Sequence, residues 1–117
     1  MSGYRSLIVW IEAKNLVVLI YRLTDSFPRS EDFALKSQMR RAAISVMSQI
    51  AEGWLRRSKK DKLHFLEIAE GSLLELESQG EVAKEVVYWK VEQYQEFDRK
   101  RAQVAFLLYR YKKQIEK

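Results

Sequence analysis

One stretch decides the fold: Gln38-Met39-Arg40-Arg41-Ala42-Ala43-Ile44-Ser45-Val46-Met47-Ser48-Gln49-Ile50-Ala51-Glu52-Gly53. At helical spacing, one of its faces is small or apolar: Met39, Ala42, Ala43, Val46 and Ile50. A second stripe is polar: Gln38, Arg41, Ser45, Ser48 and Glu52. Because serine is a poor choice for the middle of an exposed helix, we expect this stripe to meet polar partners on a neighbouring helix. We expect Gly53 to end the helix, because glycine adopts left-handed dihedrals at helix C-termini.

The composition favours a single all-helical domain over residues 1–117. Hydrophobic residues make up 47% of the chain and charged residues 32%, as in globular proteins. Four glycines and one proline leave few of the turns that a β-rich fold needs. The absence of cysteine excludes disulfides and thiolate metal sites, and the single histidine, His64, excludes a histidine cluster. We expect no cofactor, no metal and no catalytic site.

Four segments are expected to be helical. They run from about Tyr4 to Asp25, from about Ser30 to Gly53, from Ser58 to near Tyr88, and from Val91 nearly to the end of the chain. In the first, third and fourth segments, apolar residues recur at alternating spacings of three and four, which places them on one inward face. Four helices joined by short links usually pack antiparallel. The sequence therefore predicts an up-down-up-down antiparallel four-helix bundle.

Polar residues at matching levels of the second and third helices predict a structural polar network between them. In an antiparallel hairpin that turns at about residues 57–59, facing residues have numbers that sum to about 116. This rule pairs Gln38 with Gln79, Arg41 with Glu75, and Ser45 with Ser72. We expect a partly buried Arg41–Glu75 ion pair with amide and hydroxyl hydrogen bonds on either side. Such a pair fixes the register of the helices more than it adds stability, because desolvation offsets its attraction.

Positive charge is unevenly distributed along the chain, whose formal net charge is +5. Antiparallel packing gathers basic residues at the end of the bundle where the second helix ends and the third begins. We predict that nucleic acid binds there through eight residues: Arg56, Arg57, Lys59, Lys60, Lys62, Arg110, Lys112 and Lys113. Aromatic residues near the same end could stack on unpaired bases, although tyrosines at helical spacing more often belong to a core or an interface: Tyr4, Trp54, Tyr109 and Tyr111.

Three of these lysines carry the argument for function. Lys59, Lys60 and Lys62 fall in the first turn of the third helix, where positive charge opposes the helix dipole. Dipole compensation explains cations at helix C-termini, but it does not explain these three. We expect their reversal to glutamate to weaken nucleic-acid binding while the free energy of unfolding stays unchanged or rises slightly. The alternative is that the basic residues form a plain solvated surface.

The stretch at residues 38–53 resembles the signature of the four-helix-bundle proteins encoded in 23S rRNA intervening sequences, roughly Q-x-R-R-A-A-x-S-I-P-S-N-I-A-E-G. The similarity extends from residues 7–10 to residues 71–77. Met47 stands where this family usually has proline, and Gln49 where it usually has asparagine. The resemblance implies a small bundle that forms rings, pentamers in known members, with a nucleic-acid role. A related branch serves reverse transcriptases of diversity-generating retroelements. No enzymatic activity is implied.

These features predict a non-enzymatic, oligomeric, basic protein that binds RNA or DNA mainly through phosphates. The aromatic and apolar excess on the first two helices, which includes Trp10, Val17 and Tyr21, indicates the subunit interface of a homo-oligomer. The alternative is a protein–protein adaptor, for example for a reverse transcriptase, with no direct nucleic-acid role. No signal peptide or membrane span is evident in the sequence, so we expect a cytoplasmic location.

Overall fold

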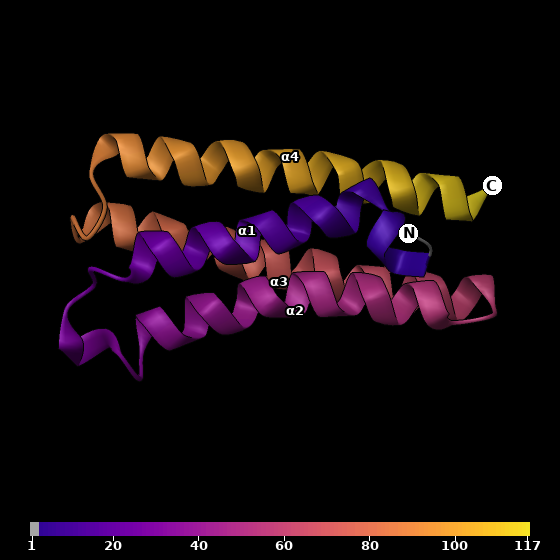
Figure 1. Cartoon of the computed structure of the whole chain (residues 1–117), viewed down its shortest axis with the longest axis horizontal. Coiled ribbons are helices and arrows are strands. Elements are labelled where there is room, and N and C mark those ends of the chain that lie inside the picture. Colours follow the sequence, from indigo (N-terminus) through magenta and orange to yellow (C-terminus); the bar gives the residue numbers. More distant parts are fainter. Residues whose placement is uncertain (1–2) are drawn as a thin grey trace.

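Four long helices make up most of residues 3–117, the part of the chain that the computed structural model describes (Figure 1). With two short 3-10 helices, the elements are η1 Gly3–Ser6, α1 Ile8–Thr24, η2 Arg29–Glu31, α2 Leu35–Leu55, α3 Lys59–Glu85 and α4 Val91–Glu116. No strand occurs between residues 3 and 117. The predicted all-α fold with four helices is confirmed.

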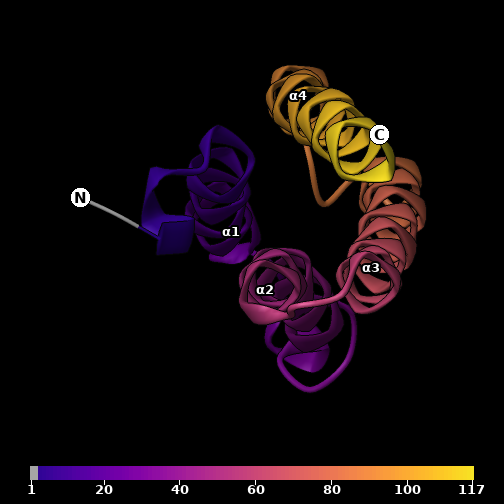
Figure 2. The ribbon, with the colours of Figure 1, turned by 90° about the vertical axis from the view of Figure 1, so that its right-hand side faces the viewer.

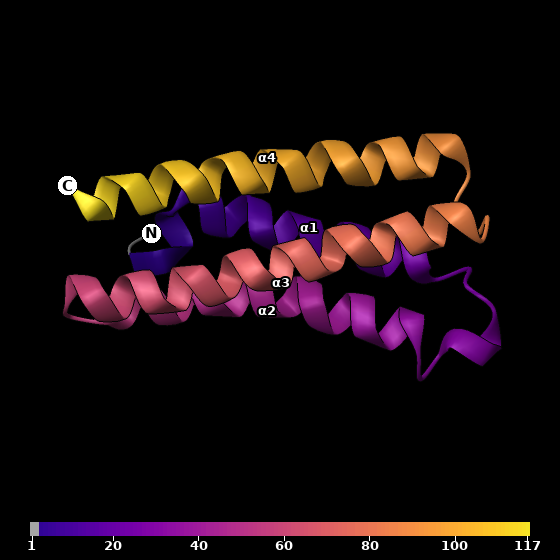
Figure 3. The same cartoon turned by 180° about the vertical axis from the view of Figure 1, so that it is seen from behind.

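The helices lie side by side along an axis 43 Å long. Successive helices run in opposite directions in Figure 1, so the start of α1, the end of α4 and the α2–α3 link lie together at its right-hand side. Seen from that side, the helices follow one another around the bundle in chain order (Figure 2). The α2 and α3 helices share the most extensive contact; seen from behind, they lie together near the α2–α3 link and diverge toward the other end (Figure 3).

Two helices begin later than the sequence suggests. Residues 4–6 belong to η1, and Leu7 has an extended backbone (φ −74°, ψ 124°) that separates η1 from α1. The second helix was expected to begin near Ser30, but α2 starts at Leu35 after the separate turn η2. A glutamate supplies the cap there, since the Glu31 carboxylate accepts a hydrogen bond from the Leu35 backbone N–H at 3.1 Å.

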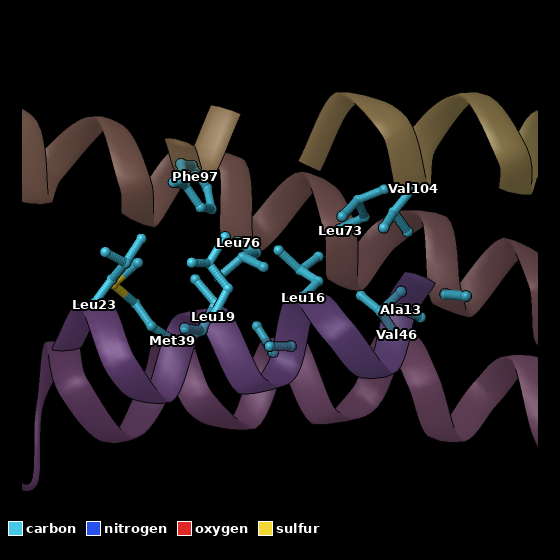
Figure 4. Close-up of a cluster of buried hydrophobic side chains, with 14 of the residues drawn as sticks. Ala13, Leu16, Leu19, Leu23, Met39, Val46, Leu73, Leu76, Phe97 and Val104 are labelled. Atoms are coloured by element: carbon cyan, nitrogen blue, oxygen red, sulfur yellow. The ribbon is translucent and has the colours of Figure 1, made fainter. Parts of the chain in front are cut away.

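The core lies between the four helices, as the close-up in Figure 4 shows. The predicted apolar face of α2 is buried, because Met39, Ala42, Ala43, Val46 and Ile50 are each at most 2% exposed. Opposite this face lie large side chains from the other three helices, namely Leu16, Leu76 and Phe97. Burying a side chain of that size contributes about 1.5–3 kcal/mol, so this layer is a main source of stability.

Two glycines are needed because helices approach closely, and one of them corrects the sequence analysis. Gly53 does not end its helix: it is helical and buried, and α2 continues to Leu55. A Cβ at position 53 would lie 3.3 Å from the Lys62 carbonyl oxygen and 3.4 Å from the Phe65 Cβ. A Cβ at Gly80 would overlap the ring of Phe97, lying 2.8 Å from its Cζ. Gly53 therefore lets the end of α2 approach the start of α3.

The predicted polar network between α2 and α3 forms at one of its three levels. The Ser45 and Ser72 hydroxyl oxygens lie 2.8 Å apart and share a hydrogen bond. Arg41 and Glu75 are both exposed and form no ion pair, so the predicted buried pair is wrong. Arg41 lies four residues before Ser45, and Glu75 lies three residues after Ser72. Around the helix axis, Arg41 is therefore turned by about 40° from Ser45, and Glu75 by about 60° from Ser72. Long charged side chains at those angles turn outward and stay hydrated.

The third level does not form a hydrogen bond either. Gln38 is exposed, whereas the Gln79 side-chain oxygen is buried and has no hydrogen-bond partner in the described chain. The two glutamines therefore do not pair, although both belong to the polar stripes identified in the sequence. The predicted register of α2 against α3 is therefore correct at Ser45 and Ser72. The two residue pairs predicted farther from the α2–α3 turn do not form.

Candidate nucleic-acid interface

All eight basic residues predicted to bind nucleic acid lie at one end of the bundle. They come from the last turns of α4, the α2–α3 link at residues 56–58, and the first turn of α3. These segments meet at the end that faces the viewer in Figure 2, together with the start of α1. We call this the basic end. Arg5 in η1 and Lys117 after α4 add two more exposed cations to it.

Two of the three lysines that carried the functional argument have structural partners. The Lys62 ammonium donates to the backbone carbonyls of Trp54 at 2.9 Å and Gly53 at 3.5 Å, at the C-terminus of α2. The Lys59 ammonium donates to the carbonyls of residues 116 and 117 at 3.3 and 3.0 Å, at the C-terminus of α4. Cations stabilise helix C-termini, where carbonyl groups lack partners.

This finding changes the interpretation of the first turn of α3. Positive charge at a helix N-terminus is unfavourable for that helix. Antiparallel neighbours place two helix C-termini beside it, and each of the two lysines caps one of them. The contacts argue against preserved stability when all three lysines are reversed, because glutamate at Lys59 or Lys62 would face backbone oxygens; we therefore expect that variant to be less stable. Lys60 alone among the three is exposed and has no described partner.

Arg56 and Lys112 are also engaged in contacts within the chain. The Arg56 guanidinium pairs with Glu52 at 2.8 Å and lies 5.1 Å from the centre of the Phe65 ring. The Lys112 ammonium lies 3.0 Å from the Glu70 carboxylate, which joins α4 to α3. Donating this hydrogen bond to Glu70 raises the pKa of Lys112. Each of these two cations is therefore already paired with a carboxylate of the same chain.

The remaining cations are available to a ligand. Arg57, Lys60 and Arg110 are exposed and have no hydrogen-bonded or ion-paired acceptor within residues 3–117. The Lys113 side chain is 57% exposed, and its ammonium lies 3.5 Å from the Glu116 carboxylate, which is long for an ion pair. Of the eight predicted residues, these four can bind an anion without first losing a contact that stabilises the bundle.

Two aromatic side chains at the basic end are accessible. Tyr109 is 55% exposed and Trp54 is 37% exposed. The Lys113 ammonium lies 5.5 Å from the Tyr109 ring centre, and the Lys62 ammonium lies 5.7 Å from the Trp54 ring. Tyrosine and tryptophan beside cations form surfaces on which a base can stack while its phosphate is bound.

The described residues, 3–117, contain neither a group of side chains able to hold a metal ion nor a helix able to cross a membrane. Histidine and carboxylate side chains within residues 3–117 form no group of three or more that can hold a metal ion. None of the described helices combines the length and the apolar character that crossing a bilayer requires.

Comparison with known proteins identifies the family. A family model described as the 23S rRNA-intervening sequence protein matches residues 5–110. The chain belongs to this family. The chain is also similar in fold to a crystal structure described as a protein with unknown function from the S23 ribosomal protein family of Bacteroides thetaiotaomicron, with a TM-score of 0.81. That protein is 23% identical and covers 91% of this chain and 99% of its own, so the likeness concerns the fold. No curated protein matches the chain.

In this 23S rRNA-intervening sequence protein, sequence reasoning found the basic end but not the roles within it. The partners of Lys59 and Lys62 are backbone carbonyls of other helices, which no residue type reveals. The antiparallel prediction did contain a signal, since it places the start of the third helix beside two helix C-termini. Sequence reasoning also missed the contribution of Leu7, which precedes α1, and of Ile8, its first residue, which line a groove beside Tyr109.

Proposed function

We propose that this protein is a non-enzymatic, oligomeric bundle that binds RNA or DNA through phosphates at its basic end. One observation carries the proposal: Arg57, Lys60 and Arg110 extend into solvent from three different segments without any described acceptor. Exposed arginine and lysine side chains are the usual ligands of nucleic-acid phosphates. The family name refers to 23S rRNA, which makes RNA the first ligand to test.

The free cations of the basic end are distinguished by lying together. Elsewhere some basic residues are paired with carboxylates, as in Lys100–Glu12 at 2.7 Å and Arg101–Glu77 at 3.2 Å, and the exposed arginines without a described partner come one each from η2, α2 and α4. Unpaired like charges at one end repel one another, and the repulsion is relieved when a polyanion binds. We expect little sequence specificity, because phosphate contacts carry no sequence information.

The test uses two triple variants with the same change in net charge. In the first, Arg57→Glu, Lys60→Glu and Arg110→Glu reverse the free cations of the basic end. In the second, Arg29→Glu, Arg41→Glu and Arg99→Glu reverse three exposed arginines elsewhere that also have no described partner. Binding to a fluorescent RNA is measured by anisotropy. We expect the first variant to lose most of its affinity and the control to lose little. Equal losses would contradict a specific site at the basic end.

We propose that the protein assembles into a homo-oligomeric ring, with five subunits favoured. Exposed apolar side chains away from the basic end support self-association: Val18 is 62% exposed, Tyr21 42% and Ile44 36%. A ring multiplies the basic end, so several weak contacts act on one nucleic-acid strand. Light scattering measures the mass in solution. A clean monomer at micromolar concentration would overturn the ring.

A second candidate function is a protein–protein adaptor, for example for a reverse transcriptase. It is supported by apolar residues at the opposite end, where Phe33 is 97% exposed, Val87 78% and Val91 66%. Val87 also has φ of 62°, a left-handed conformation that costs a non-glycine residue about 1–2 kcal/mol. Salt separates the two functions, because phosphate binding weakens steeply as salt rises and an apolar contact changes little.

A further inference from the structure

A groove runs along the surface at the basic end, between the start of α1 and the last turns of α4. Its volume is about 700 Å³. One wall is apolar and consists of Leu7, Ile8 and Val9. The other wall comes from α4 and carries two tyrosines and several polar side chains. Figure 2 shows the two helices that form these walls, with their basic ends toward the viewer. The volume lies in the range of pockets that bind small organic molecules.

The charge of this groove distinguishes it from two other hollows in the described surface. Arg110, Lys113 and Lys117 line it, and no Asp or Glu does; the carboxylate of Glu116 lies nearby, 3.5 Å from the Lys113 ammonium. A hollow farther along the α1–α4 seam contains Glu96, and one between α3 and α4 contains Glu70 and Glu77. Three cations without a lining carboxylate make the groove complementary to an anion, whereas the other two hollows are mixed in charge.

The two tyrosines give the groove an aromatic character as well. Tyr109 is 55% exposed, so much of its side chain is accessible to a ligand, and the Lys113 ammonium lies 5.5 Å from the centre of its ring. Tyr111 is partly buried, which raises the pKa of its hydroxyl and keeps it protonated. That hydroxyl takes part in no hydrogen bond within residues 3–117 and remains available as a donor. An accessible aromatic side chain, a free hydroxyl and three cations suit a ligand that has a flat base and a phosphate.

We propose that this groove binds unpaired nucleotides of a single-stranded nucleic acid, with a base stacked on Tyr109 and its phosphates bound by Arg110, Lys113 and Lys117. The proposal rests on the proposed function and adds that the preferred ligand is single-stranded. A base in a duplex has both faces covered by its neighbours, so it cannot stack on a side chain. A duplex therefore keeps only the phosphate contacts.

The test compares strands with and without bases, RNA with DNA, and single strands with a duplex. The probes are an oligouridine RNA, an abasic strand of the same length and charge, an oligothymidine DNA, and an RNA duplex. The protein variants are Tyr109→Leu and the control Phe106→Leu, which changes an aromatic residue of α4 that is 58% exposed and does not line the groove. Because the Phe106 ring lies 5.7 Å from the Arg110 guanidinium, the quantity compared is the ratio of affinities for the oligouridine and the abasic strand, to which a phosphate contact contributes equally. Affinity is measured by anisotropy at low salt.

Wild type should bind the oligouridine about tenfold more tightly than the abasic strand, because stacking on one aromatic residue has roughly this effect. Tyr109→Leu should remove that difference, and Phe106→Leu should retain it. Equal affinity for RNA and DNA strands would indicate a site that reads the base and phosphate alone, and a preference for RNA would indicate a contact to the 2′-hydroxyl. Either result is compatible with base binding in the groove.

Three other outcomes would overturn the groove proposal, alone or together with the proposed function. If the abasic strand and Tyr109→Leu bind as tightly as their counterparts, the groove does not bind bases and this inference is wrong. The proposed function survives that result as long as the Arg57, Lys60 and Arg110 reversals still weaken binding. If those reversals have no effect either, both proposals fail. A change in mass by light scattering on Tyr109→Leu would show that a second copy of the chain occupies the groove.

Discussion

Lys60 and Lys62 separate stability from binding at the basic end. The Lys62 ammonium contacts two carbonyl oxygens at the C-terminus of α2, whereas Lys60, two residues earlier, has no described partner. We consider Lys62→Met and Lys60→Met, which remove the charge and keep an unbranched apolar side chain. One variant removes a helix cap, and the other removes only a free cation.

The expected magnitudes follow from these contacts. A cation at a helix C-terminus contributes about 0.3–1 kcal/mol, and up to about 2 kcal/mol when it is partly buried, as Lys62 is. Its position 5.7 Å from the Trp54 ring centre adds about 0.5 kcal/mol. We therefore expect Lys62→Met to lower the free energy of unfolding by about 1–2 kcal/mol. Lys60→Met should change it by less than about 0.5 kcal/mol.

The assay is urea and thermal unfolding followed by far-ultraviolet circular dichroism. For a chain of this length, each kcal/mol corresponds to a shift in Tm of roughly 3–6 °C. RNA binding by the same samples should weaken more in Lys60→Met than in Lys62→Met. If the two variants were equally stable, the contact between Lys62 and the end of α2 would not contribute as described. A larger loss of binding in Lys62→Met than in Lys60→Met would refute the assignment of Lys60 as the free cation.

Two further predictions concern α3 and its contacts with α4. Gly80→Ala should lower the free energy of unfolding by about 1–3 kcal/mol, because the new Cβ would overlap the buried Phe97 ring. Gly71→Ala on the same helix meets no atom within 4 Å and should raise it by about 0.5–1 kcal/mol, and equal Tm values would contradict this contrast. Tyr94 donates a hydrogen bond to Glu81, which raises the pKa of Tyr94 to about 12. Since the proton is held more tightly in the folded state, wild type should lose stability between pH 10 and 12, and Tyr94→Phe should lose less there; identical alkaline melting profiles would argue against the hydrogen bond.

The sequence was sufficient to predict the four helices and their buried faces. Apolar residues at spacings of three and four identify the inward side of a helix regardless of its neighbours, so the buried face around Ala42 and Val46 was predictable. The Ser45–Ser72 contact was also predictable, because short side chains at a helix crossing have few other places to go. The position of the α2–α3 turn was enough to place Ser45 opposite Ser72, without knowledge of the angle at which the two helices cross.

The partners of long charged side chains could not be predicted in the same way. Arg41 and Glu75 were expected to pair across the α2–α3 seam, but each has several rotatable bonds and turns toward water. Lys62 finds backbone carbonyls instead of a carboxylate, and such partners leave no mark in residue spacing. The groove beside Tyr109 depends on where the start of α1 lies against α4, which is a property of packing and not of either helix alone.

The salt dependence of RNA binding tests the central claim most directly. The measurement compares wild type with the variant Arg57→Gln, Lys60→Gln, Arg110→Gln over a range of salt concentrations with one single-stranded RNA. For wild type, the logarithm of the association constant should fall linearly with the logarithm of the salt concentration. Each phosphate contact on a single strand contributes a slope of about −0.7, so losing three contacts should make the slope shallower by about 2. An affinity that does not change with salt, or the same slope in both proteins, would contradict phosphate binding at the basic end.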